Sequence, residues 1–360
     1  MRRSAAEDVI HRKAILAEDW EDPFYESFCD GWLRYERSDQ WVGSGGVAAG
    51  LGVADSVGRM YRDGATMLAD MRETLRSTEN FWVSKSMMDL ALQVAPSMPD
   101  EDLLPPDLPA RQGWMWYETP YRQIDVRRQV LYDNAIMWSA WGDRVRVWHF
   151  TDKGETRDSV NQAILRVEGY YEQLPQLMLS HVFDMKFNEH LPRGLTWDTP
   201  LPPGAKLEVK KVTNADGSEA IMYATDETVD IREEPQVVRS PLAAFIVCLW
   251  RLCQQSIADR WTEELQRHAR KRMTRAHLPV SPITVITLRR RAQHAEEGET
   301  HVEWQHRWMV RGHWRKQPYR EENADGEKVT VYRNIYINPY LKGPEDKPLL
   351  IRDKVNALIR

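Results

Sequence analysis

Tryptophan is the residue type that most restricts how this chain can fold. The 360 residues include fifteen Trp, together with thirteen Tyr and seven Phe. Large aromatic side chains bury extensive apolar area and dominate the interiors and interfaces of folded proteins. A chain with this content can form a core, so we expect folded structure rather than disorder over most of its length.

Charge is distributed unevenly along the chain. From Arg239 to the end, 23 Lys and Arg stand against 14 Asp and Glu, whereas the first 238 residues carry 26 against 40. A basic final third on an acidic protein favours a face that binds an anionic partner. The alternative is that the acidic and basic parts neutralise each other within the fold, and charge alone does not separate the two.

The three cysteines and the apolar runs bear on the cellular compartment. Cys29, Cys248 and Cys253 are odd in number and lack metal-ligand spacing, which is typical of buried free thiols in a reducing compartment. The N-terminal residues lack the apolar segment of a signal peptide, and the longest apolar run, Pro241–Trp250, is too short to span a bilayer. We therefore expect a cytoplasmic protein without a membrane partner.

Periodicity along the chain predicts an α+β fold with mixed helices and antiparallel β-hairpins. Helical spacing covers residues 1–48, 55–95 and 159–190, and hairpins are expected around Gly142–Asp143 and Asp216–Gly217. The proline-rich residues 96–109 indicate a linker or a wrapped loop.

The clearest helix begins at Ser240–Pro241, because Ser is a good cap and Pro suits the first helical position. Its first half is apolar, and its second half is basic up to residue 275. We expect this long helix to pack on an antiparallel sheet formed by residues 283–288, 302–312 and 329–337. Three regions result: an acidic, Trp- and Met-rich helical region at 1–103, an α+β domain with hairpins at 104–238, and a basic module at 239–360.

Basic and aromatic side chains alternate in the C-terminal module, most densely from His301 to Arg320. Arg and Lys neutralise phosphates, while aromatic rings stack on unpaired bases, so this pattern favours binding of single-stranded RNA or a ribonucleoprotein. Tyr319 is a further candidate for stacking. The candidate nucleic-acid-binding residues are Arg289, Arg290, Trp308, Arg311, Trp314, Arg315, Lys316 and Arg320.

Two other interpretations fit the same segment. A metal-independent ribonuclease would use His306 or His313 as general acid or base, with Tyr319 nearby. Alternatively, the Trp residues belong to the core, and the module is a non-enzymatic antagonist of a host factor. The spacing of His301, His306 and His313 matches no zinc motif, so we expect neither a metal nor another cofactor.

Several segments occur in an order that resembles a known family. They are LPPDLPARQGWMWYETP at Leu104–Pro120, ADRWTEELQRHARKRMTRAHLP at Ala258–Pro279, RGHWR at Arg311–Arg315 and KGP at Lys342–Pro344. Over roughly Leu104–Leu349 the chain resembles a functionally uncharacterised family carried by actinobacteria and their bacteriophages. The RGHWR region is also distantly similar to the type V-A anti-CRISPR class.

That class is associated with recognising a nascent effector polypeptide and lowering its messenger RNA. The resemblance implies a phage- or mobile-element-type protein that acts on RNA or a ribonucleoprotein, in host defence or translation, with a host or phage protein as a further partner. We expect a binding protein ahead of a ribonuclease.

Overall fold

The computed structural model describes residues 5–36, 61–124, 130–156, 174–196, 199–213, 219–225, 229, 236–289, 307–310, 312–322 and 328–342. The chain separates into two units. The first comprises Met1–Gln254 and Ala258–Leu288, and the second comprises Gln255–Ile257 and Arg289–Arg360. Helices and a mixed sheet occur together in the first unit, so the α+β class is confirmed.

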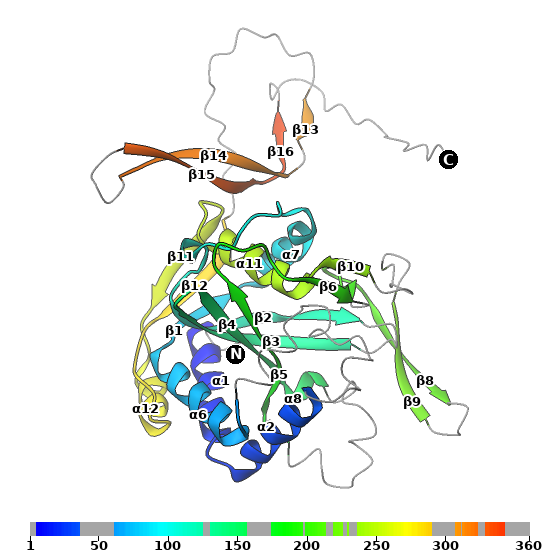
Figure 1. Ribbon diagram of the computed structural model, residues 1–360, viewed down its shortest axis with the longest axis vertical. Coiled ribbons are helices and arrows are strands. Elements are labelled where there is room, and N and C mark those ends of the chain that lie inside the picture. The colour runs from blue at the N-terminus through cyan, green and yellow to red at the C-terminus, as the bar shows by residue number, and fades with distance from the viewer. Residues whose placement is uncertain are drawn as a thin grey trace. The chain divides into compact units, whose positions relative to one another are not determined.

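A mixed sheet of eight strands forms the centre of the first unit (Figure 1). Its order is β11–β12–β1–β2–β3–β4–β5, and the short β7 pairs with β2. Strand β1 is parallel to both of its neighbours, β12 and β2, and the other pairs are antiparallel. The strands are β1 (Glu79–Val83), β2 (Gln112–Ile124), β3 (Val130–Trp141), β4 (Arg144–Asp152), β5 (Leu177–Lys186), β7 (Thr199–Pro200), β11 (Ala258–Glu263) and β12 (Ile283–Leu288).

Four helices cover one face of this sheet (Figure 1): α1 (Ala5–Asp19), α2 (Pro23–Glu36), α6 (Gly64–Ser77) and α12 (Arg267–Arg275). The core beneath them contains Trp20, Trp114, Trp148 and Phe150, all almost fully buried. The Phe150 ring lies 5.5 Å from the Trp114 ring and 6.3 Å from the Trp20 ring. The expectation of an aromatic core is therefore confirmed for this layer.

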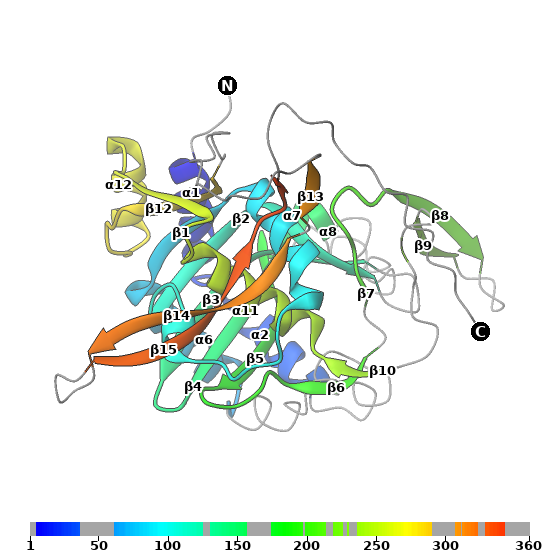
Figure 2. The same cartoon turned by 90° about the horizontal axis from the view of Figure 1, so that it is seen from above.

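Helices α11 (Pro241–Cys253) and α7 (Lys85–Val94) lie on the opposite face, which Figure 2 views from above. The Ala243 N–H donates to Ser240 Oγ at 3.3 Å, which confirms the predicted cap. Every residue from Leu242 to Cys253 is buried. Trp250 lies 5.3 Å from Trp138, and Phe245 lies 4.6 Å from Tyr121, between ring centroids.

The single long helix predicted from Ser240 is wrong. Helix α11 ends at Cys253, and the chain then forms strand β11 before the basic helix α12 begins at Arg267. Residues Ala258–Glu263 include only one β-branched residue, Thr262, so their local preference for a strand is weak. Antiparallel pairing of β11 with β12 decides their conformation instead.

Two other sequence predictions had different outcomes. The helix expected over residues 159–190 is wrong from Leu177 onward, because Leu177–Lys186 form β5 against β4, and residues 157–173 lie outside the described residues. The two hairpins are confirmed. Strands β3 and β4 join at Gly142, whose φ of 52° suits glycine, and β8 (Leu207–Thr213) pairs with β9 (Glu219–Thr225). The remaining elements of this unit are α8 (Lys153–Thr156), β6 (Arg193–Thr196) and β10 (Gln236–Arg239), which pairs with β6.

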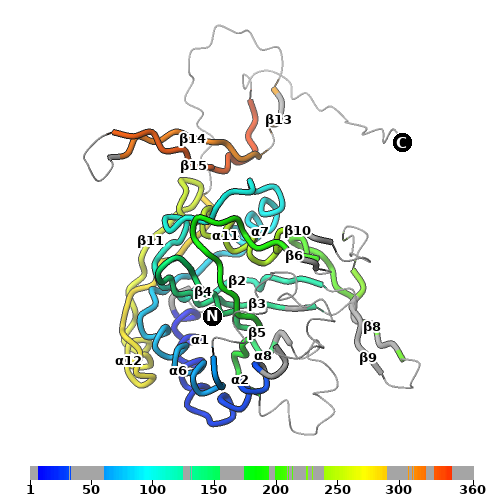
Figure 3. The backbone as a smooth tube through the Cα atoms, in the orientation of Figure 1, coloured from blue at the N-terminus to red at the C-terminus, as the bar shows by residue number. Residues whose placement is uncertain are grey.

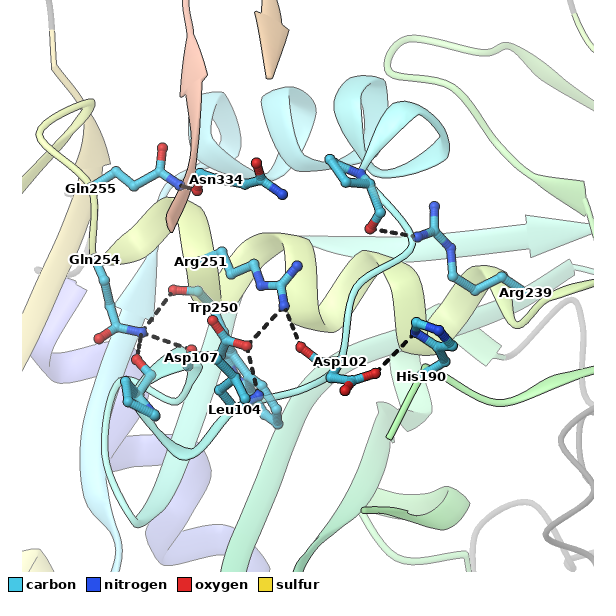
Figure 4. Close-up of polar contacts among 12 residues, drawn as sticks. Asp102, Leu104, Asp107, His190, Arg239, Trp250, Arg251, Gln254, Gln255 and Asn334 are labelled. Carbon is cyan, nitrogen blue, oxygen red and sulfur yellow. Dashed lines mark hydrogen bonds and ion pairs between the residues drawn. The ribbon is translucent and has the colours of Figure 1, made fainter. Parts of the chain in front are cut away.

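The proline-rich segment is a wrapped loop rather than a linker (Figure 4). It contains two short 3-10 helices, η1 (Ala95–Ser97) and η2 (Pro105–Asp107). Arg251 Nη2 on α11 donates to Asp107 Oδ2 at 2.9 Å and to the Asp102 carbonyl at 3.0 Å. Gln254 Nε2 donates to the carbonyls of Pro106 and Asp107. The segment thus accepts hydrogen bonds from the end of α11.

A glycine in β2 provides a test of this packing. A Cβ on Gly113 would overlap the buried Trp138 indole, whereas a Cβ on Gly31 in α2 would meet nothing within 4 Å. We expect Gly113→Ala to lower the free energy of unfolding by about 1–3 kcal/mol through overpacking. The matched Gly31→Ala is expected to raise it by roughly 0.5–1 kcal/mol through helix propensity. Urea denaturation checks both signs, and equal effects would contradict the packing assignment.

Candidate nucleic-acid interface

A long antiparallel hairpin dominates the described part of the second unit. Strand β14 (His313–Glu322) pairs with β15 (Lys328–Ile337) over ten residues, and Figure 3 traces both strands. The expected strand at 329–337 is confirmed. In the register, Trp314 lies opposite Tyr336, Lys316 opposite Asn334, and Pro318 opposite Tyr332. Because side chains alternate along a strand, this register separates the hairpin into two faces.

The basic-aromatic face comprises Trp314, Lys316, Pro318, Arg320 and Glu322 of β14, with Lys328, Thr330, Tyr332, Asn334 and Tyr336 of β15. Tyr332 is 58% exposed, the most exposed of the large hydrophobic side chains in the described residues. Lys316 Nζ lies 6.0 Å from the centroid of the Tyr332 ring. Lys316 and Arg320 are both exposed, so positive charge and a flat ring are presented to solvent on one face. Glu322 and Lys328 form the last pair of the register on this face.

The opposite face of the hairpin has a different character. Its aliphatic residues are Val329, Val331, Ile335 and Ile337, and its cations are already bonded. Arg333 Nη2 lies 2.5 Å from Glu321 Oε1, and its guanidinium lies 5.7 Å from the Tyr319 ring centroid. Arg315 Nη2 donates to Gln317 Oε1 at 2.5 Å. We call this the aliphatic face. Its cations are less available to an external anion.

Packing at one end of the hairpin explains part of the RGHWR motif. Trp314 is half-buried and meets the buried Tyr336 edge-on, with ring centroids 5.4 Å apart. A Cβ on Gly312 would overlap the Tyr336 hydroxyl, so the motif requires glycine there. The Gln255 side chain accepts from the Tyr336 N–H at 2.9 Å and donates to the Asn334 carbonyl at 3.4 Å, which covers this end of the β15 edge.

The structure brings only some of the predicted nucleic-acid-binding residues together. Lys316 and Arg320 share the basic-aromatic face with Trp314, whereas Arg315 and Tyr319 lie on the aliphatic face. Trp308 belongs to a separate two-stranded pair, β13 (Trp308–Val310) with β16 (Tyr340–Lys342). Arg289 is exposed directly after β12. Arg290 and Arg311 lie outside the described residues.

The candidate ribonuclease residues are also separated. His313 and Tyr319 lie six residues apart on one strand, about 20 Å at 3.3 Å per residue. Two side chains at this separation cannot contact one phosphate together. His306 lies outside the described residues.

Sequence reasoning missed Tyr332, the ring that the hairpin exposes most. The observed register places Tyr332 across from Pro318, near Lys316. The local density of Trp and His drew attention to Trp314, and identifying Tyr332 requires the exact pairing register of the two strands.

A buried titratable cluster in the first unit is sealed from solvent. Asp133 lies between two imidazoles, 3.5 Å from His149 Nδ1 and 3.8 Å from His181 Nδ1, and accepts from Ser180 Oγ at 2.6 Å. Burial lowers the pKa of His149. Burial by itself raises the pKa of Asp133, but the two imidazoles outweigh it and hold that pKa well below its ordinary value. All three residues are buried, which favours a structural role.

Within the described residues, no group of three or more His, Cys, Asp and Glu side chains is placed to hold a metal ion. All three cysteines are buried free thiols, as expected, and burial raises the pKa of Cys29 and Cys253 to about 12.

In the part of the chain that the structure describes, no helix is long and apolar enough to cross a membrane. No protein-family model, curated protein or solved structure matches this chain.

Proposed function

We propose that this protein binds single-stranded RNA, free or in a ribonucleoprotein, through the basic-aromatic face of the β14–β15 hairpin. The observation that supports this most is the exposed Tyr332 ring with Lys316 beside it and Arg320 on the same face. Cations supply the affinity for phosphate, and the ring supplies a stacking platform. Such binding suits a phage- or mobile-element-type protein that acts on host defence or translation from the cytoplasm.

The geometry of the face favours single strands over a duplex. Lys316 and Arg320 are four residues apart, about 13 Å along the strand, with Tyr332 on the neighbouring strand between them. Bases in a single strand are free to stack on such a ring, whereas bases in an A-form duplex are already stacked and present mainly backbone and 2′-hydroxyl groups.

The hairpin provides a matched pair of variants for the test. Lys316→Gln with Arg320→Gln removes two positive charges from the basic-aromatic face, and Arg315→Gln with Arg333→Gln removes two from the aliphatic face. Fluorescence anisotropy with a 20-nucleotide unstructured RNA, over a salt series, measures both. We expect the first pair to reduce the slope of log affinity against log salt by about 1.4, and the second pair to reduce it by much less. Tyr332→Ala is expected to weaken binding between about 5- and 100-fold.

Three results would overturn the proposal. They are absence of RNA binding by the wild-type protein, affinity that does not depend on salt, and equal effects of the two paired variants. Cleavage of the RNA in EDTA that is lost in His313→Ala would establish the ribonuclease alternative instead. Circular dichroism of each variant checks that the hairpin still forms.

A further inference from the structure

Helix α12 carries an unusual density of positive charge. Six of its nine residues are basic, and none is acidic: Arg267, His268, Arg270, Lys271, Arg272 and Arg275. Ala269 and Met273, one helical turn apart, are buried in the core beside α1. These two residues fix which side of the helix faces inward, so the remaining side chains lie at the flanks or on the outer side.

The flanking basic side chains are bonded within the first unit. His268 Nε2 lies 3.2 Å from Glu7 Oε1, and Arg272 Nη2 lies 3.8 Å from Glu18 Oε2, both on α1. Arg270 Nε donates to the Leu265 carbonyl at 2.8 Å. The acidic N-terminal region thus neutralises part of the basic C-terminal third, the alternative that charge alone left open.

The other three cations form a stripe with no partner among the described residues. Arg267, Lys271 and Arg275 are exposed and lie at positions i, i+4 and i+8. Successive side chains along the stripe are therefore about 6 Å apart along the helix axis. Arg275 in the last turn complements the helix dipole, but Arg267 in the first turn opposes it, and like charges at this spacing repel each other. Helix stability therefore explains at most Arg275, and an external anion would explain the whole stripe.

The surroundings of the stripe favour nucleic acid over a membrane as that anion. The apolar residues of α12 are buried, so the helix has no apolar face to insert into lipid. Trp261 on β11 is 45% exposed and pairs in register with Val285, a residue of the same core that holds Ala269 and Met273. Its ring therefore lies on the sheet face that α12 covers and is available for stacking on a base.

We propose that α12 is a second phosphate-binding surface, on which Arg267, Lys271 and Arg275 contact the backbone of a single-stranded nucleic acid beside the Trp261 ring. This deepens the proposed function, on which it rests for the class of ligand. Residues of the stripe contact no base edge in this proposal, so they contribute affinity without sequence preference.

The experiment compares two triple variants of the full chain by anisotropy over a salt series, with a 20-nucleotide RNA. Arg267→Gln, Lys271→Gln and Arg275→Gln remove the stripe, and Arg62→Gln, Arg76→Gln and Lys210→Gln remove three scattered exposed charges of the same unit. We expect the stripe variant to reduce the salt slope by about 2 and the scattered variant to change it little. Trp261→Ala is expected to weaken binding severalfold.

Each outcome bears on one proposal. Equal salt slopes for the two triple variants would overturn the proposal that the stripe binds phosphate, whatever the result for the hairpin variants. A loss of RNA affinity in the stripe variant, with Lys316→Gln and Arg320→Gln without effect, would support the stripe as a binding surface. The same result would overturn the proposal that the hairpin binds RNA. Vesicles containing phosphatidylserine form a separate arm. Vesicle binding that the stripe variant alone abolishes, with RNA affinity unchanged, would overturn the assignment to nucleic acid.

Discussion

Arg146→Met is expected to lower the free energy of unfolding of the first unit by about 3–5 kcal/mol. Arg146 lies buried on β4 and makes a two-point ion pair with Asp184 on β5, with Nε–Oδ1 and Nη2–Oδ2 distances of 2.8 and 3.1 Å. Its Nη1 also donates to the Tyr61 hydroxyl at 2.6 Å. Removing the guanidinium leaves the buried Asp184 carboxylate without its counter-charge, and such losses are large.

Two variants serve as controls for Arg146. Arg144→Met removes the partly exposed neighbour that pairs with the exposed Asp143, and is expected to cost less than about 1 kcal/mol. Adding Asp184→Leu to Arg146→Met is expected to recover most of the loss, because the unpaired charge is then gone. Urea unfolding followed by Trp fluorescence reports mainly on the first unit, since twelve of the fifteen Trp precede residue 289. A loss below 1 kcal/mol for Arg146→Met would show that Asp184 reaches water.

Lys13 is expected to make stability depend on pH between neutral and alkaline conditions. Its ammonium is buried on α1, where Nζ donates to Asn80 Oδ1 at 2.8 Å and to the Thr78 carbonyl at 3.3 Å. Burial lowers the pKa of Lys13 from 10.5 to about 7. Between these values the unfolded chain binds a proton that the folded protein does not, so the free energy of unfolding rises with pH.

The measurement is the difference in the free energy of unfolding between wild type and Lys13→Met across this range. From pH 7 to pH 9 the wild type is expected to gain about 2 kcal/mol relative to the variant. At pH 6 the variant is expected to be the more stable by roughly 1–3 kcal/mol, because no charge is buried. Lys85→Met, which removes an exposed lysine bonded to Asp89, should keep the wild-type profile. Parallel curves for wild type and Lys13→Met would contradict the assignment.

The elements that sequence patterns predicted correctly depend on contacts close in the chain. The Ser240 hydroxyl caps α11 by accepting from the N–H of Ala243, only three residues further on, and the Gly142 turn joins adjacent strands. Burial of Leu242–Trp250 followed from their apolar composition, whereas the buried Arg251 takes its partners from residues 102 and 107. Of the hairpin that carries the proposed interface, only the second strand was expected, over residues 329–337, whereas the strand His313–Glu322 was not.

The proposed interface itself was predicted only in part, because its composition depends on register. Lys316 and Arg320 were identified as basic residues beside aromatic ones, but a shift of one residue in pairing moves each side chain to the other face. That alternation places Arg315 and Tyr319 on the aliphatic face and leaves Trp314 packed against Tyr336. The ring that remains exposed, Tyr332, comes from the partner strand.

By itself, then, the sequence determined the α+β class, the aromatic core and the buried thiols. It also determined the helix that begins at Ser240 and the hairpins, because their caps and turns depend on residues close to one another in the chain. Only the tertiary structure decided that Ala258–Glu263 form a strand beside β12 and that Leu177–Lys186 form one beside β4. It also decided that Arg146 meets Tyr61 and Asp184, 85 and 38 residues away in the chain. The physical reason is that backbone pairing and buried charges take their partners from distant segments, and local preference does not encode which segments will meet.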